Sequence, residues 1–183
     1  MLKFKRYSFF TLFLVISTLS ANKIAVATKV KGLVELMKVG KNEFSSLKTG
    51  SILEDGDKIR TGNSGFVAII FIDDKSTLKI KENSEAVITG QRTTKDISKK
   101  INLDGGTIRA SISKQNVDFV IQTPTSVASV KGTDFWLISD DSGDQVIGME
   151  GLVRVNTETG QEVSVSSGMT GVSTPDGQVG VSE

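Results

Sequence analysis

The chain has 183 residues, of which 38% are hydrophobic and 23% are charged, a composition typical of one soluble domain of ordinary size. It contains no cysteine and no histidine, which excludes disulfides, thiol nucleophiles, Cys/His zinc sites and histidine-based triads. The 22 basic and 21 acidic residues give a formal net charge of +1. We predict no cofactor and no resident metal, since only an all-oxygen cation site or carboxylate chemistry would remain open.

Residues 1–27 have the form of an export signal. A basic start precedes the apolar run Phe9–Ile16, and small residues follow. We expect cleavage after Ala21 or after Ala27, which would give a periplasmic or secreted protein. Because this apolar segment is shorter than the roughly 20 residues of a membrane span, membrane association is expected only if it stays uncleaved.

Removal of residues 1–27 makes the chain slightly acidic. The basic count falls from 22 to 18, because Lys3, Lys5, Arg6 and Lys23 are lost, while all 21 acidic residues remain. Nucleic acid demands a basic footprint, so it is not among the expected partners.

Beyond the signal, the sequence alternates short apolar runs with glycine turns. Residues 28–39 alternate as a half-buried strand, and Phe66–Ile72 is apolar throughout, which predicts a central core strand. The return run Thr77–Lys81 predicts a hairpin with it. Gln91–Lys100 is polar and is predicted to be an exposed loop, and no segment carries the apolar stripe of a helix.

Strands are expected to continue to near the end of the chain. Thr107–Ser113 alternates cleanly, and Asp134–Ile138 carries the single tryptophan. We predict an all-β fold: an antiparallel two-sheet, jelly-roll-like sandwich or β-roll of many short strands. The β domain is expected at residues 28–172, followed by a flexible C-terminal tail at residues 173–183.

Two segments far apart in the sequence repeat one another. Gly32–Leu36 matches Gly151–Val155, and Leu47–Gly50 matches Val165–Gly168 in the spacing of an aliphatic residue and a glycine. We predict that the first and last hairpins occupy related positions flanking one core. The alternative is that unrelated hairpins simply share turn residues.

The order and spacing of the turn motifs resemble those of the FecR domain over about residues 28–170. The residues that carry the resemblance are Gly32, Gly50, Gly56, Asp57, Thr61, Gly106, Pro124, Gly132, Thr133, Phe135 and Gly151. Two motifs depart from the family pattern. Asp74-Lys75-Ser76 stands where Asp-Gly-Ser is usual, and Lys131-Gly132-Thr133 stands where an Arg-Gly-Thr-like element is usual.

The resemblance implies a periplasmic, all-β domain. The best-known members of that family are transmembrane regulators that relay siderophore-receptor occupancy to an extracytoplasmic sigma factor, through a cytoplasmic segment and a transmembrane helix before this domain. Here an export signal is expected in that place, which implies a stand-alone domain without the anti-sigma segment. We expect a non-catalytic module that binds a protein or an envelope glycan. The alternatives are a soluble modulator of a transmembrane signalling or sigma-regulatory system, and a glycan-active enzyme with paired carboxylates.

Two features suggest a binding surface. The candidate residues are Arg92, Lys95, Lys99, Lys100 and Trp136. The basic run would dock an anionic glycan, a lipid headgroup or an acidic partner, unless it is only a solvated loop. Adjacent strand residues face opposite sides, so Phe135 and Trp136 are not both in the core, and an outward Trp136 would offer an aromatic platform.

Two sets of aspartate residues each allow two interpretations. Asp55 and Asp57 could form an oxygen-ligand cation site or cap a turn through backbone N–H groups, and we favour the turn. Asp140, Asp141 and Asp144 could form a weak calcium site, but they lack the ligand spacing of an EF-hand, which favours a solvated turn.

Overall fold

The computed structural model describes residues 22–92 and 97–183, and its regular elements are all β-strands. In chain order they are β1 (Lys23–Lys31), β2 (Val34–Met37), β3 (Ser45–Ser46), β4 (Ile52–Glu54), β5 (Asp57–Thr61), β6 (Phe66–Phe71), β7 (Thr77–Ile80), β8 (Glu85–Arg92), β9 (Ile97–Ser111), β10 (Phe119–Gln122), β11 (Ser126–Val130), β12 (Asp134–Asp140), β13 (Gly143–Glu150), β14 (Leu152–Thr157), β15 (Glu162–Ser166), β16 (Thr170–Ser173) and β17 (Val179–Ser182). The described residues include no helix long and apolar enough to cross a membrane.

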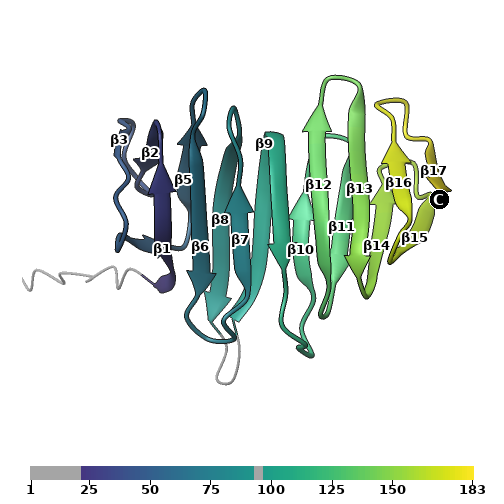
Figure 1. Cartoon of the computed structure of the whole chain (residues 1–183), viewed down its shortest axis with the longest axis horizontal. Coiled ribbons are helices and arrows are strands. Elements are labelled where there is room, and N and C mark those ends of the chain that lie inside the picture. Colours follow the sequence, from purple (N-terminus) through teal and green to yellow (C-terminus); the bar gives the residue numbers. More distant parts are fainter. Residues whose placement is uncertain (1–21, 93–96) are drawn as a thin grey trace, which may run out of the picture.

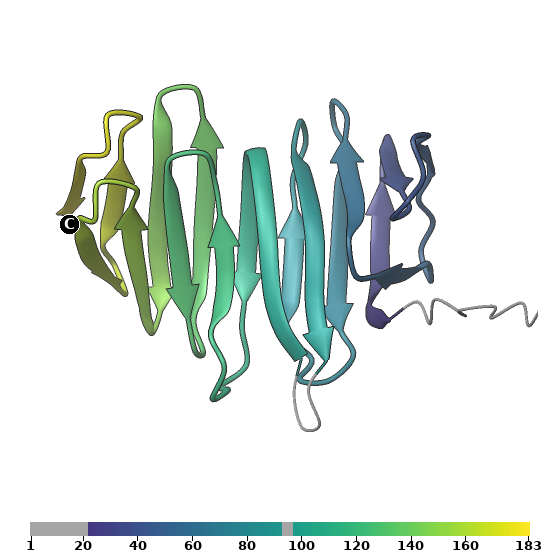
Figure 2. The same cartoon turned by 180° about the vertical axis from the view of Figure 1, so that it is seen from behind.

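The strands form two layered sheets that share β9 (Figures 1 and 2). Sheet A has the order β4-β1-β6-β7-β9-β12-β13-β16-β17. Sheet B has the order β3-β2-β5-β8-β9-β10-β11-β14-β15. All pairings are antiparallel except that of β9 with β10. The predicted all-β, two-sheet architecture is therefore confirmed.

Strand β9 belongs to both sheets because it bends through a corner at Asp104–Gly106. Residues before the corner pair with β8 and β10 in sheet B, and residues after it pair with β7 and β12 in sheet A. Gly106 has φ +112°, and a Cβ atom there would lie 2.1 Å from Ser84 Oγ. The structure therefore has a corner within one continuous strand at this place.

The core fills the space between the two sheets. Alternate residues of each strand point inward, as in β6, where Val67, Ile69 and Phe71 are fully buried. Phe71 meets Phe119 of sheet B edge to face, with ring centroids 5.5 Å apart. Each large apolar side chain buried in this way contributes about 1.5–3 kcal/mol, so the inward faces dominate stability.

The predicted repeat is confirmed as a repeated succession of strands, β1–β4 and β13–β16. Each copy begins in sheet A, crosses to sheet B, forms a hairpin there and returns to pair with its own first strand in sheet A. The crossings coincide with Gly32 and Gly50 in the first copy and with Gly151 and Gly168 in the second. The two repeats lie at opposite ends of the sandwich (Figure 1).

Both expected boundaries of the domain need correction. Strand β1 begins at Lys23 rather than at residue 28, and Ile24, Ala25 and Ala27 are fully buried. Cleavage after Ala27 would remove these core residues, whereas cleavage after Ala21 keeps β1 whole. Residues 1–21 lie outside the described part of the chain. At the other end, the expected flexible tail forms β17, which pairs with β16 along four residues.

Candidate functional site

The described residues of the predicted exposed loop, 91–92 and 97–100, belong to the paired strands β8 and β9, and Lys99 is not on the surface. Its side chain is 0% exposed, because Ile97, Lys99 and Ile101 alternate toward the interior along β9. Lys100, on the opposite face of the strand, is exposed. Lys95 and the side chain of Arg92 lie outside the described residues. The interpretation of the whole run as a solvated patch is therefore wrong at Lys99.

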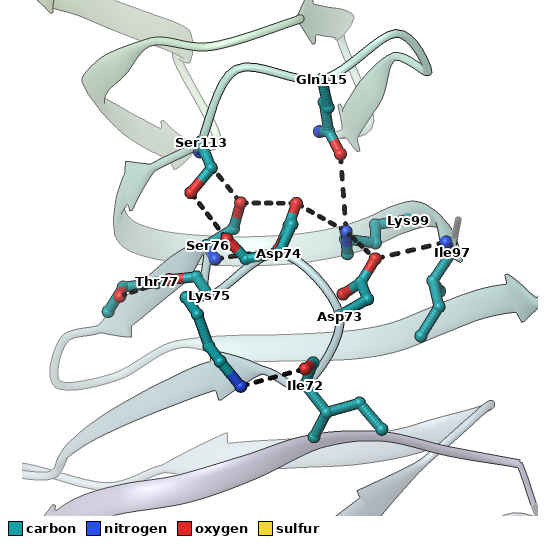
Figure 3. Close-up of polar contacts among 10 residues, drawn as sticks. All are labelled: Ile72, Asp73, Asp74, Lys75, Ser76, Thr77, Ile97, Lys99, Ser113 and Gln115. Atoms are coloured by element: carbon teal, nitrogen blue, oxygen red, sulfur yellow. Dashed lines mark hydrogen bonds and ion pairs between the residues drawn. The ribbon is translucent and has the colours of Figure 1, made fainter. Parts of the chain in front are cut away.

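Lys99 instead occupies a buried ionic network below the β6–β7 turn (Figure 3). Its Nζ lies 2.7 Å from Asp73 Oδ2 and 2.7 Å from Asp74 Oδ2, and 5.4 Å from the centre of the Phe71 ring. The two carboxylate side chains are only 18% and 17% exposed. Burial by itself would raise the pKa of Asp74, but hydrogen bonds from Lys99 and Ser76 outweigh burial and lower it.

The same network stabilises the turn Asp74-Lys75-Ser76, which departs from the family pattern. Asp74 Oδ1 accepts from the Ser76 N–H at 2.9 Å, and the Ser113 hydroxyl donates to the Asp74 carbonyl at 2.8 Å. The Ser113 N–H donates to Ser76 Oγ at 3.0 Å. The groups of this network therefore bind one another and join β6, β7 and β9, which is a structural role.

Trp136 lies on the outer face of sheet A. Phe135 is 1% exposed in the core and Trp136 is half-buried, which confirms that the two rings face opposite sides. The strand register aligns Lys79, Arg109, Trp136 and Ile147 in one row across β7, β9, β12 and β13. This row combines cationic, aromatic and aliphatic groups on the face of the sheet that points to solvent.

The central pair of this row is held in a fixed geometry. Arg109 donates from Nε and Nη2 to the two carboxylate oxygens of Asp134, at 2.9 and 3.0 Å, and the Ser111 hydroxyl donates to the same carboxylate at 3.0 Å. The hydrogen bond from Arg109 is the main cause of the lowered pKa of Asp134. The Arg109 guanidinium carbon lies 5.6 Å from the Trp136 ring centre, within the range of a cation–π contact. We refer to Arg109, Asp134 and Trp136 as the tryptophan platform.

Hollows in the surface lie near these strands. One of about 270 Å³ adjoins the tryptophan platform and is lined by Ser111, Asp134, Lys114 and Glu150, among others. A larger one of about 650 Å³ lies where β9 turns its corner. Its charged lining residues are Arg60, Glu82, Glu85, Asp104, Asp140 and Asp141. The acidic excess of the larger hollow disfavours anionic ligands there.

The first predicted acidic pair caps backbone. Asp57 is fully buried and accepts from the Glu54 N–H at 2.9 Å, from the Val39 N–H at 3.2 Å and from Lys38 Nζ at 2.8 Å. Asp55 accepts from the Gly90 N–H at 2.9 Å. The favoured role, in which an acid holds a turn, is therefore confirmed for Asp57, whereas Asp55 binds the backbone of β8.

Two residues of the second acidic group, Asp140 and Asp144, lie in different surroundings. Asp140 is exposed and accepts from the Ser142 N–H, as expected for a solvated turn, but Asp144 is 1% exposed. Hydroxyl groups of Thr123, Thr125 and Ser126 each lie 2.5 Å from its Oδ2. Thr123, which directly precedes Pro124 of the family pattern, thus helps to hold this carboxylate. In the described part of the chain, no group of three or more acidic side chains is placed to hold a metal ion.

Comparison with known proteins identifies related sequences and structures. The family model described as FecR protein matches residues 57–154, which is 98 of the 183 residues. No curated protein matches the chain. Two crystal structures, at 2.50 and 1.65 Å resolution, of a "putative anti-sigma factor" from Parabacteroides distasonis ATCC 8503 are similar, with TM-scores of 0.59 and 0.57 and 11% identity. Each comparison covers 69% of this chain and 59% of the other, so this chain spans little more than half of those proteins.

Proposed function

Because this chain belongs to the FecR family, we propose that it is a non-catalytic binding module of a signalling system that regulates a sigma factor. We propose further that it acts after export, in the periplasm or outside the cell, and that its partner is a protein. An envelope glycan is the other ligand class that suits an exported module of this kind.

Membership of the FecR family and the two similar crystal structures support the signalling part of this proposal. The similar structures carry an anti-sigma description, and this chain shares their fold over 69% of its length. The export part is supported by the form of residues 1–21, a basic start followed by an apolar run. Cleavage after Ala21 would leave all strands intact.

The observation that carries the binding role is the fixed geometry of the tryptophan platform. Aromatic and arginine side chains dominate the binding energy of protein interfaces. Asp134 holds Arg109 through two hydrogen bonds, so the platform loses little side-chain freedom when a partner covers it. Trp136 lies on the outer face of sheet A, so its replacement would remove the contact surface without opening the core.

A complementation experiment tests the proposal. The gene would be deleted, and expression of the sigma-controlled envelope genes would be compared after reintroduction of the wild type, Trp136→Ala or Val120→Ala. Val120 is a matched control, since it is half-buried like Trp136 but lies on β10 of sheet B. We expect deletion to change expression of these genes, Val120→Ala to restore it and Trp136→Ala to fail.

Capture of partners from periplasmic extract separates the ligand classes. Wild type and Val120→Ala should retain one protein that Trp136→Ala loses. If the deletion leaves expression unchanged, the signalling role is wrong. Glycan binding that depends on Trp136 would then assign the platform to the envelope instead.

A further inference from the structure

We propose that this protein associates end to end with copies of itself, the last repeat of one copy docking against the first repeat of the next. This inference goes beyond the proposed function and rests on different residues. The two surfaces are the first-repeat end, residues 23–54, and the last-repeat end, residues 143–183.

Both ends carry strand edges that have no partner among the described strands. At the first-repeat end, β3 pairs only with β2, whereas on β4 the Ile52 carbonyl accepts from Lys38 Nζ and the Glu54 N–H donates to Asp57. At the last-repeat end, β17 pairs only with β16 and β15 only with β14. Such edges present unpaired N–H and C=O groups, and proteins usually block them with lysine, proline or a bulge. Strand β17 (Val-Gly-Val-Ser) contains none of these devices.

Exposed apolar side chains accompany these edges. Val39 and Ile52 are 54% and 43% exposed at the first-repeat end. Val172 and Val181 are 41% and 37% exposed on neighbouring strands at the last-repeat end. Contact between the two ends would remove apolar surface from water on both partners.

The charges of the two ends favour a second copy of this chain as the binding partner. Residues 23–54 contain six basic and three acidic residues, a net charge of +3. Residues 143–183 contain one basic and six acidic residues, and without the buried Asp144 their net charge is −4. Contact between unlike ends is therefore attractive and contact between like ends is repulsive, so the charge pattern favours a head-to-tail arrangement.

A head-to-tail contact has a further consequence. The surfaces on its two sides are different, so each added copy leaves one free end of each kind. Association would therefore continue to chains of copies, with a size that rises with protein concentration. The repeats lie at opposite ends of the long axis (Figure 1). The tryptophan platform lies on β9 and β12, between the two repeats in the strand order of sheet A, so it stays free along such a chain.

Sedimentation velocity of the purified protein at low and high salt tests the association. The Debye length falls from about 30 Å at about 10 mM salt to about 3 Å at about 1 M salt. We expect concentration-dependent species larger than one chain at low salt and at least a tenfold weaker apparent association at high salt. A single species of 19.6 kDa or less at every concentration and both salts would overturn the proposal.

Charge-reversed variants identify the surfaces. One variant carries Lys31→Glu, Lys41→Glu and Lys48→Glu, and the other carries Glu158→Lys, Glu162→Lys and Glu183→Lys. All six side chains are exposed and none takes part in an ion pair of the described residues. We expect each variant alone to remain monomeric at low salt, because its two ends then have the same sign.

Mixing the two variants provides the decisive measurement. The reversed end of each variant then meets an end of opposite sign on the other, so association should return. If the mixture stays monomeric while the wild type associates, the contact is not the one proposed. Thermal unfolding of each variant, monitored by circular dichroism, shows that the absence of association does not come from loss of the fold.

Discussion

Replacement of Lys99 by alanine should strongly destabilise the fold, although the residue is a lysine in a polar stretch. The side chain is 0% exposed and its ammonium group lies 2.7 Å from each of two carboxylates. Removal of one partner from a buried ion pair typically costs 3–5 kcal/mol, because the remaining charge is left without compensation. Asp73 and Asp74 retain 18% and 17% exposure and regain some hydration, so we expect a loss of about 3 kcal/mol.

Urea unfolding of the wild type, Lys99→Ala and Lys100→Ala measures this loss. Lys100 is the matched control, since it is the next residue on the same strand but is exposed, and its replacement should change stability by less than about 0.5 kcal/mol. The denaturant slope should stay constant, so that the midpoint alone reports stability. A loss below about 1 kcal/mol for Lys99→Ala would refute the assignment of a buried, paired lysine.

The pH dependence of unfolding provides a second measurement on the same network. The pKa of Asp74 is lower in the folded protein than its ordinary value of 3.8, so the unfolded chain binds more protons in this range. Asp74 therefore contributes stability above pH 3.8, and this contribution is lost as the pH falls through its folded-state pKa. In Lys99→Ala the lowering is reduced, and the stability should depend less steeply on acid pH.

Four further substitutions test the fold. Lys75 has φ +63°, a left-handed conformation that costs an L-residue about 1–2 kcal/mol, so Lys75→Gly should raise the free energy of unfolding by about 0.5–1 kcal/mol after the entropy of glycine is deducted. Gly106→Ala would place Cβ 2.1 Å from Ser84 Oγ, and we expect a loss above about 2 kcal/mol in urea unfolding. Phe135→Ala should cost about 3–5 kcal/mol and Trp136→Ala about 1 kcal/mol, and equal losses would contradict their opposite orientation.

The fold class, the repeat and the opposite orientation of Phe135 and Trp136 follow from the sequence because they depend on local rules. Strand alternation decides which side of a sheet a residue faces, and glycine marks where the backbone crosses between sheets. The inward position of Lys99 also obeys alternation, since it lies between Ile97 and Ile101. The polar residues around Lys99 led to the prediction of an exposed loop, although this alternation was present.

Other parts of the site depend on long-range contacts that no local pattern reports. Asp73 and Lys99 are 26 positions apart, and Asp134 meets Arg109 across 25 positions. Asp144 looked like part of an exposed acidic turn, yet hydroxyls about 20 positions earlier surround it. Only the pairing of strands brings these groups together, so their roles could not be assigned from composition or spacing.

The corner in β9 also bears on how the protein unfolds. Before its corner β9 pairs with β8, and after its corner it pairs with β7. Without β9, the first half of the chain would therefore have an unpaired strand in each sheet. The second half depends on it equally through β10 and β12. Loss of this one strand would uncover four neighbours at once. The molecule, although elongated and built from repeats, should therefore melt as one cooperative unit in calorimetry rather than from its ends inward.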